Sequence, residues 1–378
     1  MKKFLLGIAM ALVAGSSSAQ VFTLEPAEIS LKPGDVQDVE MILHSAVDAY
    51  SAFQIVISMP DGIEPVCLNQ EDVDDFGDDP LYYEVTLPHI GKLQQRFNAQ
   101  RANSFYRIGE EVKKGDVVER IATTNELHII FYTQQAYTFP KEVTDESVLK
   151  IQLKATDKGY TGKSYVALNE VIMTTAATVN EKVDDITKAA TIDYSIEYEI
   201  GESGYGTLCW PVALDFSDNS FVAGYGVTAS KSSGNFMQGV AVKKVPAATP
   251  VIIMGAPGKY NLTTTKDTDL DDVSKNELEG TVDGPFKVNA DNIFALSNVG
   301  KEVGFYRCKK DLEIPQYKAY YISNNSSVNA FLFEETTGIN EIESAAEATD
   351  TYTLSGVKVN NASQKGIYIV NGKKVVVK

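Results

Sequence analysis

The chain has 378 residues, a length that fits two domains and an appendage, and chains of this size bury enough surface to fold without disulfides. Its formal net charge of −17 and the absence of a basic cluster make nucleic acid and anionic membranes poor partners, because phosphate binding depends on Lys and Arg. The 19 Tyr and 16 Phe residues, beside many Val, Thr and Ile, favour β-structure.

The N-terminus has the order of a secretory signal peptide over residues 1–19. Lys2 and Lys3 form a basic start, an apolar stretch follows, and Ala19 is a small residue where signal peptidase needs one. We therefore predict cleavage before Gln20 and export of the chain; a buried N-terminal helix, the alternative, does not need this order. No later run reaches about 18 apolar residues, so no transmembrane segment is expected after signal removal.

Residues 20–192 show the alternation of a β-sandwich. Apolar side chains occupy every second position of residues 53–59, with Gln54 and Ser58 on the other face, and a Pro-Asp-Gly sequence then ends the strand. Residues 149–155 alternate in the same way, with Lys and Gln between the apolar positions. Each pattern predicts a strand with one buried and one polar face.

Further strands are predicted in the same part of the chain. Residues 127–132 are apolar on both faces and predict a central strand, and residues 165–173 predict a long one. Residues 93–101 are interpreted as a loop or a short helix. Strands separated by loops, without a long helical period, predict a sandwich.

The order of several short motifs resembles cohesin-like domains. These motifs are Leu-Lys-Pro-Gly-Asp at residues 31–35, Tyr-Ser-Ala-Phe-Gln at 50–54, Pro-Asp-Gly at 60–62 and the strand at 149–155. The resemblance implies a flattened nine-stranded jelly-roll sandwich, in the same broad superfamily as carbohydrate-binding modules. Cohesins of cellulose-degrading assemblies bind dockerins through one flat sheet face, but the sequence assigns no residue of that face.

Residues 193–335 are predicted to form a second β domain, either a small barrel or a second sandwich. Gly and Pro are dense here and separate short β-rich runs. Residues 204–214, 246–252 and 314–320 resemble a module common in exported proteins of Bacteroidetes-type bacteria, which implies no known activity. Residues 336–350 are acidic, lack aromatic residues and are predicted to be a linker.

Residues 351–378 predict two β-hairpins, with turns at Ser-Gly (355–356) and at Asn-Gly (371–372), the latter a strong hairpin signal. The segment resembles the C-terminal sorting domain of type IX secretion. The residues that carry the match are Gly356, Gly366, Tyr368, Asn371, Gly372, Lys373, Lys374 and Lys378. The resemblance implies recognition by secretion machinery, passage to the outer-membrane surface of a Gram-negative bacterium, and removal of the tail with surface attachment or release. The alternative is an ordinary final pair of strands.

Catalytic patterns are not found. His44, His89 and His128 are far apart in the sequence and in no metal-binding spacing. Nucleophile-elbow, phosphate-loop and dinucleotide motifs are absent, and nothing places two carboxylates across a cleft as a glycosidase requires. We predict that the protein is not an enzyme and holds no cofactor or metal, and that His128 is an ordinary strand residue.

Three other features leave alternatives open. Of Cys67, Cys209 and Cys308, the last two could pair, although buried unpaired thiols are favoured. The acidic run at residues 72–79 could bind calcium or simply face water. A second acidic run at 267–271 begins like an EF-hand loop, but it lacks the required Gly and Glu further along and is rejected.

Exposed aromatic residues could serve as platforms for sugar rings. Trp210 lies in an apolar run and is expected in the core. In each of three adjacent pairs one ring could be exposed, since neighbours on a strand point to opposite faces: Tyr82 and Tyr83, Phe131 and Tyr132, Tyr320 and Tyr321.

Together these patterns predict an all-β protein: a jelly-roll or Ig-like sandwich, a small antiparallel β domain and a hairpin tail. The expected function is that of a secreted or cell-surface binding protein whose cohesin-like domain binds a polysaccharide or a protein. The alternative is a structural or adhesive component of the bacterial envelope without glycan binding.

Overall fold

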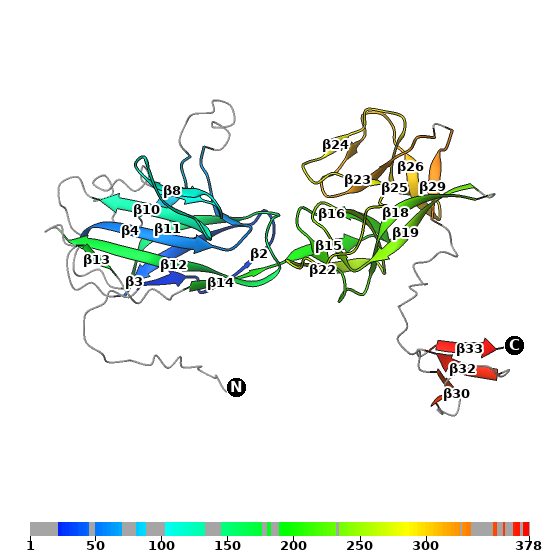
Figure 1. Ribbon diagram of the computed structural model, residues 1–378, viewed down its shortest axis with the longest axis horizontal. Helices are drawn as coiled ribbons and strands as arrows, with labels where there is room; N and C mark the ends of the chain where they lie inside the picture. The colour runs from blue at the N-terminus through cyan, green and yellow to red at the C-terminus, as the bar shows by residue number, and fades with distance from the viewer. Residues whose placement is uncertain are drawn as a thin grey trace, which may run out of the picture.

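The computed structural model describes residues 22–44, 50–69, 81–87, 103–132, 145–175, 180–182, 189–231, 234–325, 327–333, 351–353, 358–359, 366–370 and 373–377. Every helix or strand assigned within these ranges is a strand, which confirms the all-β prediction. No described segment forms a helix that could cross a bilayer. Figure 1 shows a sandwich at one end (residues 22–194), a second region beside it (residues 196–332) and a small C-terminal sheet.

The sandwich has two sheets. The five-stranded sheet has the order β1-β3-β11-β5, with β6 also paired to β11: β1 Phe22–Glu25, β3 Val36–Leu43, β11 Glu146–Ala155, β5 Ile63–Pro65 and β6 Val85–Thr86. The seven-stranded sheet has the order β2-β14-β12-β4-β10-β7, with β13 paired to β12: β2 Glu28–Leu31, β14 Ala189–Tyr194, β12 Gly162–Thr175, β4 Tyr50–Met59, β10 Asn125–Tyr132, β7 Asn103–Tyr106 and β13 Asn180–Lys182.

These sheets differ from the nine strands that the cohesin resemblance implies. The first strand is split, so that β1 lies in one sheet and β2 in the other, and the short strands β5, β6 and β13 extend the pairing. The alternating strands themselves are as predicted. The apolar faces of β4 and β11 point into the core, where Phe53 of β4 stacks on Phe131 of β10 with ring centroids 4.7 Å apart.

Strand β10 differs in one respect from its prediction. It is interior to the sheet, paired with β4 on one side and β7 on the other. Its inward residues are fully buried, but Ile130 and Tyr132 on the other face are 42% and 46% exposed. The apolar pattern on both faces of β10 therefore does not mean that both faces are buried. One face lies in the core and the other exposes apolar side chains to solvent.

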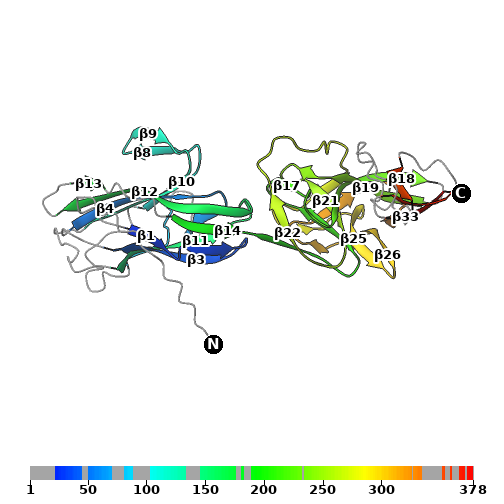
Figure 2. The same cartoon turned by 90° about the horizontal axis from the view of Figure 1, so that it is seen from below.

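A short hairpin stands over the seven-stranded sheet. It consists of β8 Glu111–Lys114 and β9 Val117–Ile121, and the chain forms it between β7 and β10. Figure 2 shows this hairpin on the side of β4, β10 and β12 that faces away from the five-stranded sheet.

The second region contains three sheets. The nine-stranded sheet has the order β16 Tyr205–Cys209, β21 Pro250–Met254, β18 Val222–Lys231, β19 Gly234–Val242, β29 Ala330–Leu332, β26 Glu302–Arg307, β25 Ile293–Val299, β28 Ala319–Ile322 and β23 Leu278–Gly280. The four-stranded sheet has the order β15 Ile196–Ile200, β22 Gly258–Thr264, β17 Leu214–Asp215 and β20 Lys244–Val245. The third sheet pairs β24 Phe286–Lys287 with β27 Glu313–Ile314.

The nine-stranded sheet curls until its ends approach each other. The Cys209 amide on β16 donates to the Tyr317 carbonyl just before β28, at 3.0 Å, and the Glu277 amide beside β23 donates to Gly226 of β18 at 2.9 Å. The sheet is thus close to a barrel, one of the two predicted forms. Both faces of β28 are covered: Tyr321 packs on Phe294 and Phe331 of the same sheet, and Tyr320 stacks on Phe286 of the β24–β27 sheet with ring centroids 4.7 Å apart. Tyr320 and Tyr321 are therefore both buried, and the expectation of one exposed ring in this pair is wrong.

The sandwich and the second region share one continuous apolar core cluster, which extends from Phe22 to Leu262. Polar contacts reinforce the junction. The Thr161 amide donates to the Thr264 hydroxyl at 2.7 Å, and the Thr264 amide donates to the Thr161 hydroxyl at 2.9 Å. The Tyr317 hydroxyl donates to Asp157 at 2.8 Å. The two parts are therefore joined by packing and by the chain connection.

The C-terminal sheet has the order β31-β30-β32-β33: β31 Lys358–Val359, β30 Thr351–Thr353, β32 Gly366–Val370 and β33 Lys373–Val377. Both predicted hairpins are present, with β30 paired to β31 and β32 paired to β33. Gly366 and Tyr368 lie on β32, and Lys373 and Lys374 on β33. The other predicted tail and cleavage residues lie outside the described residues: Ala19, Gln20, Gly356, Asn371, Gly372 and Lys378.

Candidate binding surface

The outer face of the five-stranded sheet is mainly charged and carries an ion pair between Asp38 and Lys150. Strands β3 and β11 direct acidic, basic and amide side chains outward, with the exposed Val36 at one end. Lys150 lies 2.5 Å from Asp38, and Gln152 donates to Asp38 at 3.1 Å. The hydrogen bonds from Lys150 and Gln152 outweigh desolvation and lower the pKa of Asp38. The centre of this face therefore holds charged and polar groups that bond to one another.

The outer face of the seven-stranded sheet carries a group of apolar side chains, which we call the outer patch: Ala52, Ile130, Tyr132 and Ile172. Strand register brings them together, because Ile130 and Ile172 both pair with Gln54, and Tyr132 pairs with Ala52. Ile130 and Tyr132 are well exposed, whereas Ala52 and Ile172 are half-buried. The exposed Gln54 lies between Ile130 and Ile172. Exposed apolar side chains gathered on a sheet face are a feature of interaction surfaces.

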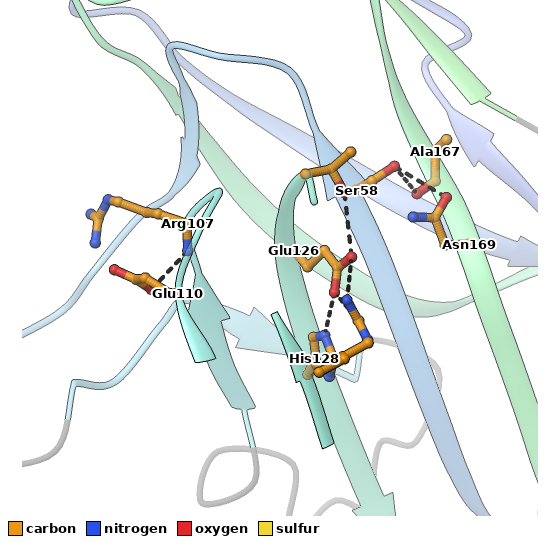
Figure 3. Close-up of polar contacts among 9 residues, drawn as sticks. Ser58, Arg107, Glu110, Glu126, His128, Ala167 and Asn169 are labelled. Atoms are coloured by element: carbon orange, nitrogen blue, oxygen red, sulfur yellow. Dashed lines mark hydrogen bonds and ion pairs between the residues drawn. The ribbon is translucent and has the colours of Figure 1, made fainter. Parts of the chain in front are cut away.

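Beside the outer patch, Glu126 forms the centre of a polar cluster (Figure 3). Its carboxylate accepts hydrogen bonds from the Arg120 guanidinium, from His128 Nε2 at 2.8 Å and from the Thr124 hydroxyl at 3.3 Å. Glu126 and His128 share the outer face of β10, and the His128 ring meets the Tyr106 ring edge-on at 5.1 Å. Ser58, opposite Glu126 on β4, instead donates to Asn169 at 3.2 Å.

The Glu126 carboxylate is only 4% exposed, and each of its oxygens already has partners. Burial by itself raises the pKa of this carboxyl group, but the hydrogen bonds from Arg120 and His128 outweigh it and leave the pKa below its ordinary value. A carboxylate that is ionised at neutral pH and whose two oxygens both accept hydrogen bonds is poorly placed to take a proton from a substrate. The cluster therefore has a structural role: it is a tie between the hairpin and the sheet.

The tie fixes the hairpin over the sheet, because Arg120 belongs to β9 and Glu126 to β10. The base of the hairpin is also held: the Gly109 amide donates to the Ala122 carbonyl at 2.8 Å, and the Ala122 amide donates to Glu110 at 2.8 Å. Ala122, Val112 of β8 and Val56 of β4 are all buried, as a hairpin folded onto the sheet requires.

The far side of the hairpin presents two further apolar side chains to solvent. Val118 and Ile121 of β9 are 45% and 58% exposed. The hairpin register pairs them with Lys113 and Glu111, and those two residues form an ion pair with each other at 3.4 Å. The outer patch and this hairpin together form a surface with a flat apolar part and a raised apolar part. From the sequence, only Tyr132 is singled out, as one of an adjacent aromatic pair; the apolar group around it and the hairpin are not predicted.

The structure decides several of the sequence-based alternatives. Cys67, Cys209 and Cys308 are all unpaired. Trp210 is buried, as predicted, and His128 is a hydrogen-bonded strand residue. Of two aromatic pairs, one ring is exposed and the other buried: Tyr82 and Tyr83, and Phe131 and Tyr132.

The acidic runs give no metal site within the described residues. The run at 72–79, together with His89 and residues 93–101, lies outside them. In the run at 267–271, Asp267 pairs with Lys244 at 2.5 Å and Asp271 accepts hydrogen bonds from the Lys243 and Lys244 amides. Among the residues that are described, no group of three His, Cys, Asp or Glu side chains could hold a metal ion.

No protein-family model and no curated protein matches the chain. Among solved structures, CaCohA2 from Clostridium acetobutylicum matches 47% of this chain and 92% of its own, at 12% identity and a TM-score of 0.30. A type I cohesin–dockerin complex from Clostridium thermocellum matches 48% of this chain and 99% of its own, at 11% identity and a TM-score of 0.29. A non-cellulosomal cohesin from Archaeoglobus fulgidus matches 47% and 91%, at 10% identity and a TM-score of 0.26. Likenesses this weak say nothing about what the chain binds.

Proposed function

We propose that the chain is an exported, non-catalytic binding protein whose sandwich recognises a protein partner through the outer patch and the hairpin beside it. The observation that carries this proposal is the contrast between the two outer faces of one sandwich. On the five-stranded sheet, acidic and basic groups pair with one another. On the seven-stranded sheet, Ile130 and Tyr132 expose apolar surface to solvent.

The chemistry of the outer patch favours a protein over a polysaccharide. Aliphatic side chains such as Ile130 offer no ring for stacking and no hydrogen bond to sugar hydroxyls. The exposed Tyr165 does not extend a row with Tyr132. Tyr132 pairs with Ala52, whereas Tyr165 lies two residues beyond the partner of Ser58, so the two are more than about 20 Å apart along β4. Because the chain carries a formal charge of −17, the partner surface is expected to be apolar with a basic rim.

The route to the partner is part of the same proposal. Residues 1–19 direct export, residues 20–192 and 193–335 are two domains, residues 336–350 link them to the tail, and residues 351–378 are read by secretion machinery at the outer membrane of a Gram-negative bacterium. The order of charged, apolar and small residues at the N-terminus supports export. The paired hairpins of the tail support a compact terminal signal.

Site-specific photo-cross-linking tests the binding surface. A benzophenone amino acid replaces Tyr132 in the full chain, expressed in the source bacterium, and the matched control carries it in place of Lys154, which is exposed on the opposite outer face. We expect one protein adduct from position 132, none from position 154, and loss of the adduct when Ile130→Glu is added. Deletion of residues 351–378 should prevent surface display.

Other results contradict the proposal in distinguishable ways. Equal adducts from both positions mean that the outer patch is not the binding surface. A carbohydrate adduct at position 132, or specific retention on a glycan array that Ile130→Glu abolishes, means that the ligand is a polysaccharide. Normal surface display with no adduct from either position points to a structural or adhesive role.

A further inference from the structure

The second region contains a cleft that the proposed function does not use. Its volume is about 400 Å³, within the range of small-molecule sites, and it opens to solvent. Strands β15, β16, β25, β27 and β28 supply its walls, so side chains that are far apart in the sequence converge there. Tyr198, Tyr205, Leu296, Ile314 and Pro315 form the apolar part of a wall that is about half polar.

Lys318 is the cation of this cleft, and it has no anionic partner. None of the ion pairs among the described residues includes its ammonium group. Its Nζ lies over the face of the Tyr198 ring, 5.6 Å from the ring centroid. Burial lowers the pKa of Lys318, and no nearby carboxylate offsets that effect. Burying an ammonium group without a counter-charge costs free energy. An anion that binds beside it would offset that cost.

The surroundings of Lys318 restrict the kind of anion. Glu199 and Glu313 also line the cleft, and both are exposed at its rim. They would repel a doubly charged phosphate group, whereas a single carboxylate can pair with one lysine at lower cost. No arginine lines the cleft to grip a phosphate with two parallel hydrogen bonds.

The walls indicate what the carboxylate is attached to. Tyr198 is held at the floor, where its hydroxyl donates to the Thr207 carbonyl at 3.4 Å, and Gly206 leaves the space for it: a Cβ at Gly206 would lie 2.1 Å from that hydroxyl. Tyr205 is held by stacking on Phe333, with ring centroids 4.8 Å apart. Two fixed tyrosines beside aliphatic side chains suit a compact ring.

We propose that this cleft binds a small monocarboxylate carried on a ring, with the carboxylate paired to Lys318 and the ring between Tyr198 and Tyr205. This role is separate from the protein-binding surface of the sandwich.

Calorimetric titration of the full chain with sodium glucuronate and sodium benzoate tests the proposal. We expect at least one of them to bind with a dissociation constant of about 1 mM or tighter. Its neutral counterpart, the methyl ester of glucuronate or benzamide, should bind at least about tenfold more weakly. Lys318→Met should weaken carboxylate binding about 10- to 100-fold, as expected for loss of a charge-assisted hydrogen bond. Lys318→Arg should retain most of it.

The matched control is Lys310→Met, which removes an exposed lysine from the same region and should leave binding unchanged. Lys318→Met removes a poorly solvated charge, so its melting temperature should not fall, and loss of binding would then not reflect unfolding. The proposal is overturned if neither carboxylate binds, if the neutral compounds bind equally well, or if a normally folded Lys318→Met chain binds as the native one does.

Discussion

The guanidinium of Arg120 donates to both carboxylate oxygens of Glu126 and so joins the β8–β9 hairpin to the sheet beneath it. The two residues are six positions apart, but they lie on different strands, and the turn between them brings the hairpin back over the outer face. Because the carboxylate is buried and the guanidinium half-exposed, the pair fixes the hairpin without an uncompensated charge in the core.

Glu126→Gln should destabilise the protein by about 1–3 kcal/mol, since it replaces charge-assisted hydrogen bonds and leaves Arg120 and His128 with a neutral acceptor. Urea unfolding followed by tyrosine fluorescence measures the loss. The control is Glu119→Gln, which removes an exposed carboxylate 3.6 Å from Lys114 in the same hairpin and should cost less than about 0.5 kcal/mol. Equal losses in the two variants would contradict the assigned role of Glu126.

The same pair predicts a difference in acid stability. The pKa of Glu126 is lowered in the folded protein, because hydrogen bonds from Arg120 and His128 outweigh the effect of burial. A lowered carboxyl pKa stabilises the folded state above the ordinary pKa of about 4.3 and loses that contribution as the pH falls through the folded value. The stability advantage of the native chain over Glu126→Gln should thus be constant above about pH 5 and shrink below it. A pH-independent difference between the two unfolding curves would refute this.

The thiols predict a pattern of chemical reactivity. Burial, with a smaller contribution from the negative charge of Asp283, raises the pKa of Cys209 to about 11, and burial raises the pKa of Cys308. Neither forms a thiolate readily near pH 8, whereas Cys67 is half-buried. Ellman's reagent should therefore modify one thiol per native chain and three in denaturant. The native Cys209→Ser variant should still react rapidly at one thiol, whereas the native Cys67→Ser variant should react at none. This pair of results would identify Cys67 as the reactive residue.

The predictable parts of the fold are those that depend on local pattern. Alternation with a period of two fixes which side chain of a strand is buried, so residues 53–59 and 149–155 were assigned to the correct faces. The Asn-Gly hairpin of the tail is likewise a local signal. These features need no knowledge of what else packs nearby.

The missed parts depend on contacts between distant segments. Tyr320 and Tyr321 are both buried because the β24–β27 sheet covers one face of β28 and the nine-stranded sheet encloses the other, which the sequence of that strand cannot reveal. The hairpin at residues 111–121 was overlooked because a bulge interrupts its alternation, although glycines at 109 and 115 mark its turns. The outer patch arises only when β10 and β12 both pair with β4.

A glycine pair in the sandwich gives a last prediction, because one turn was predicted from sequence but its packing was not. Gly62 ends the Pro-Asp-Gly turn with φ +80°, and a Cβ there would lie 2.1 Å from the Cα of Gly159. Gly159 in turn lies against the ring of Tyr194, whose hydroxyl donates to the Thr156 carbonyl at 2.6 Å. The turn, the glycine and the ring are stacked with no room for a methyl group.

Gly62→Ala should therefore destabilise the protein by two separate effects: about 1–2 kcal/mol for an alanine in the left-handed region and about 1–3 kcal/mol more for the displaced backbone. Gly109→Ala isolates the first effect, since Gly109 has φ +89° and a Cβ there would meet nothing within 4 Å. Thermal and urea unfolding of both variants should show the larger loss at Gly62. If the two losses are the same, the Gly62–Gly159 contact is looser than the structure has it, and left-handed geometry alone explains the glycine in this turn.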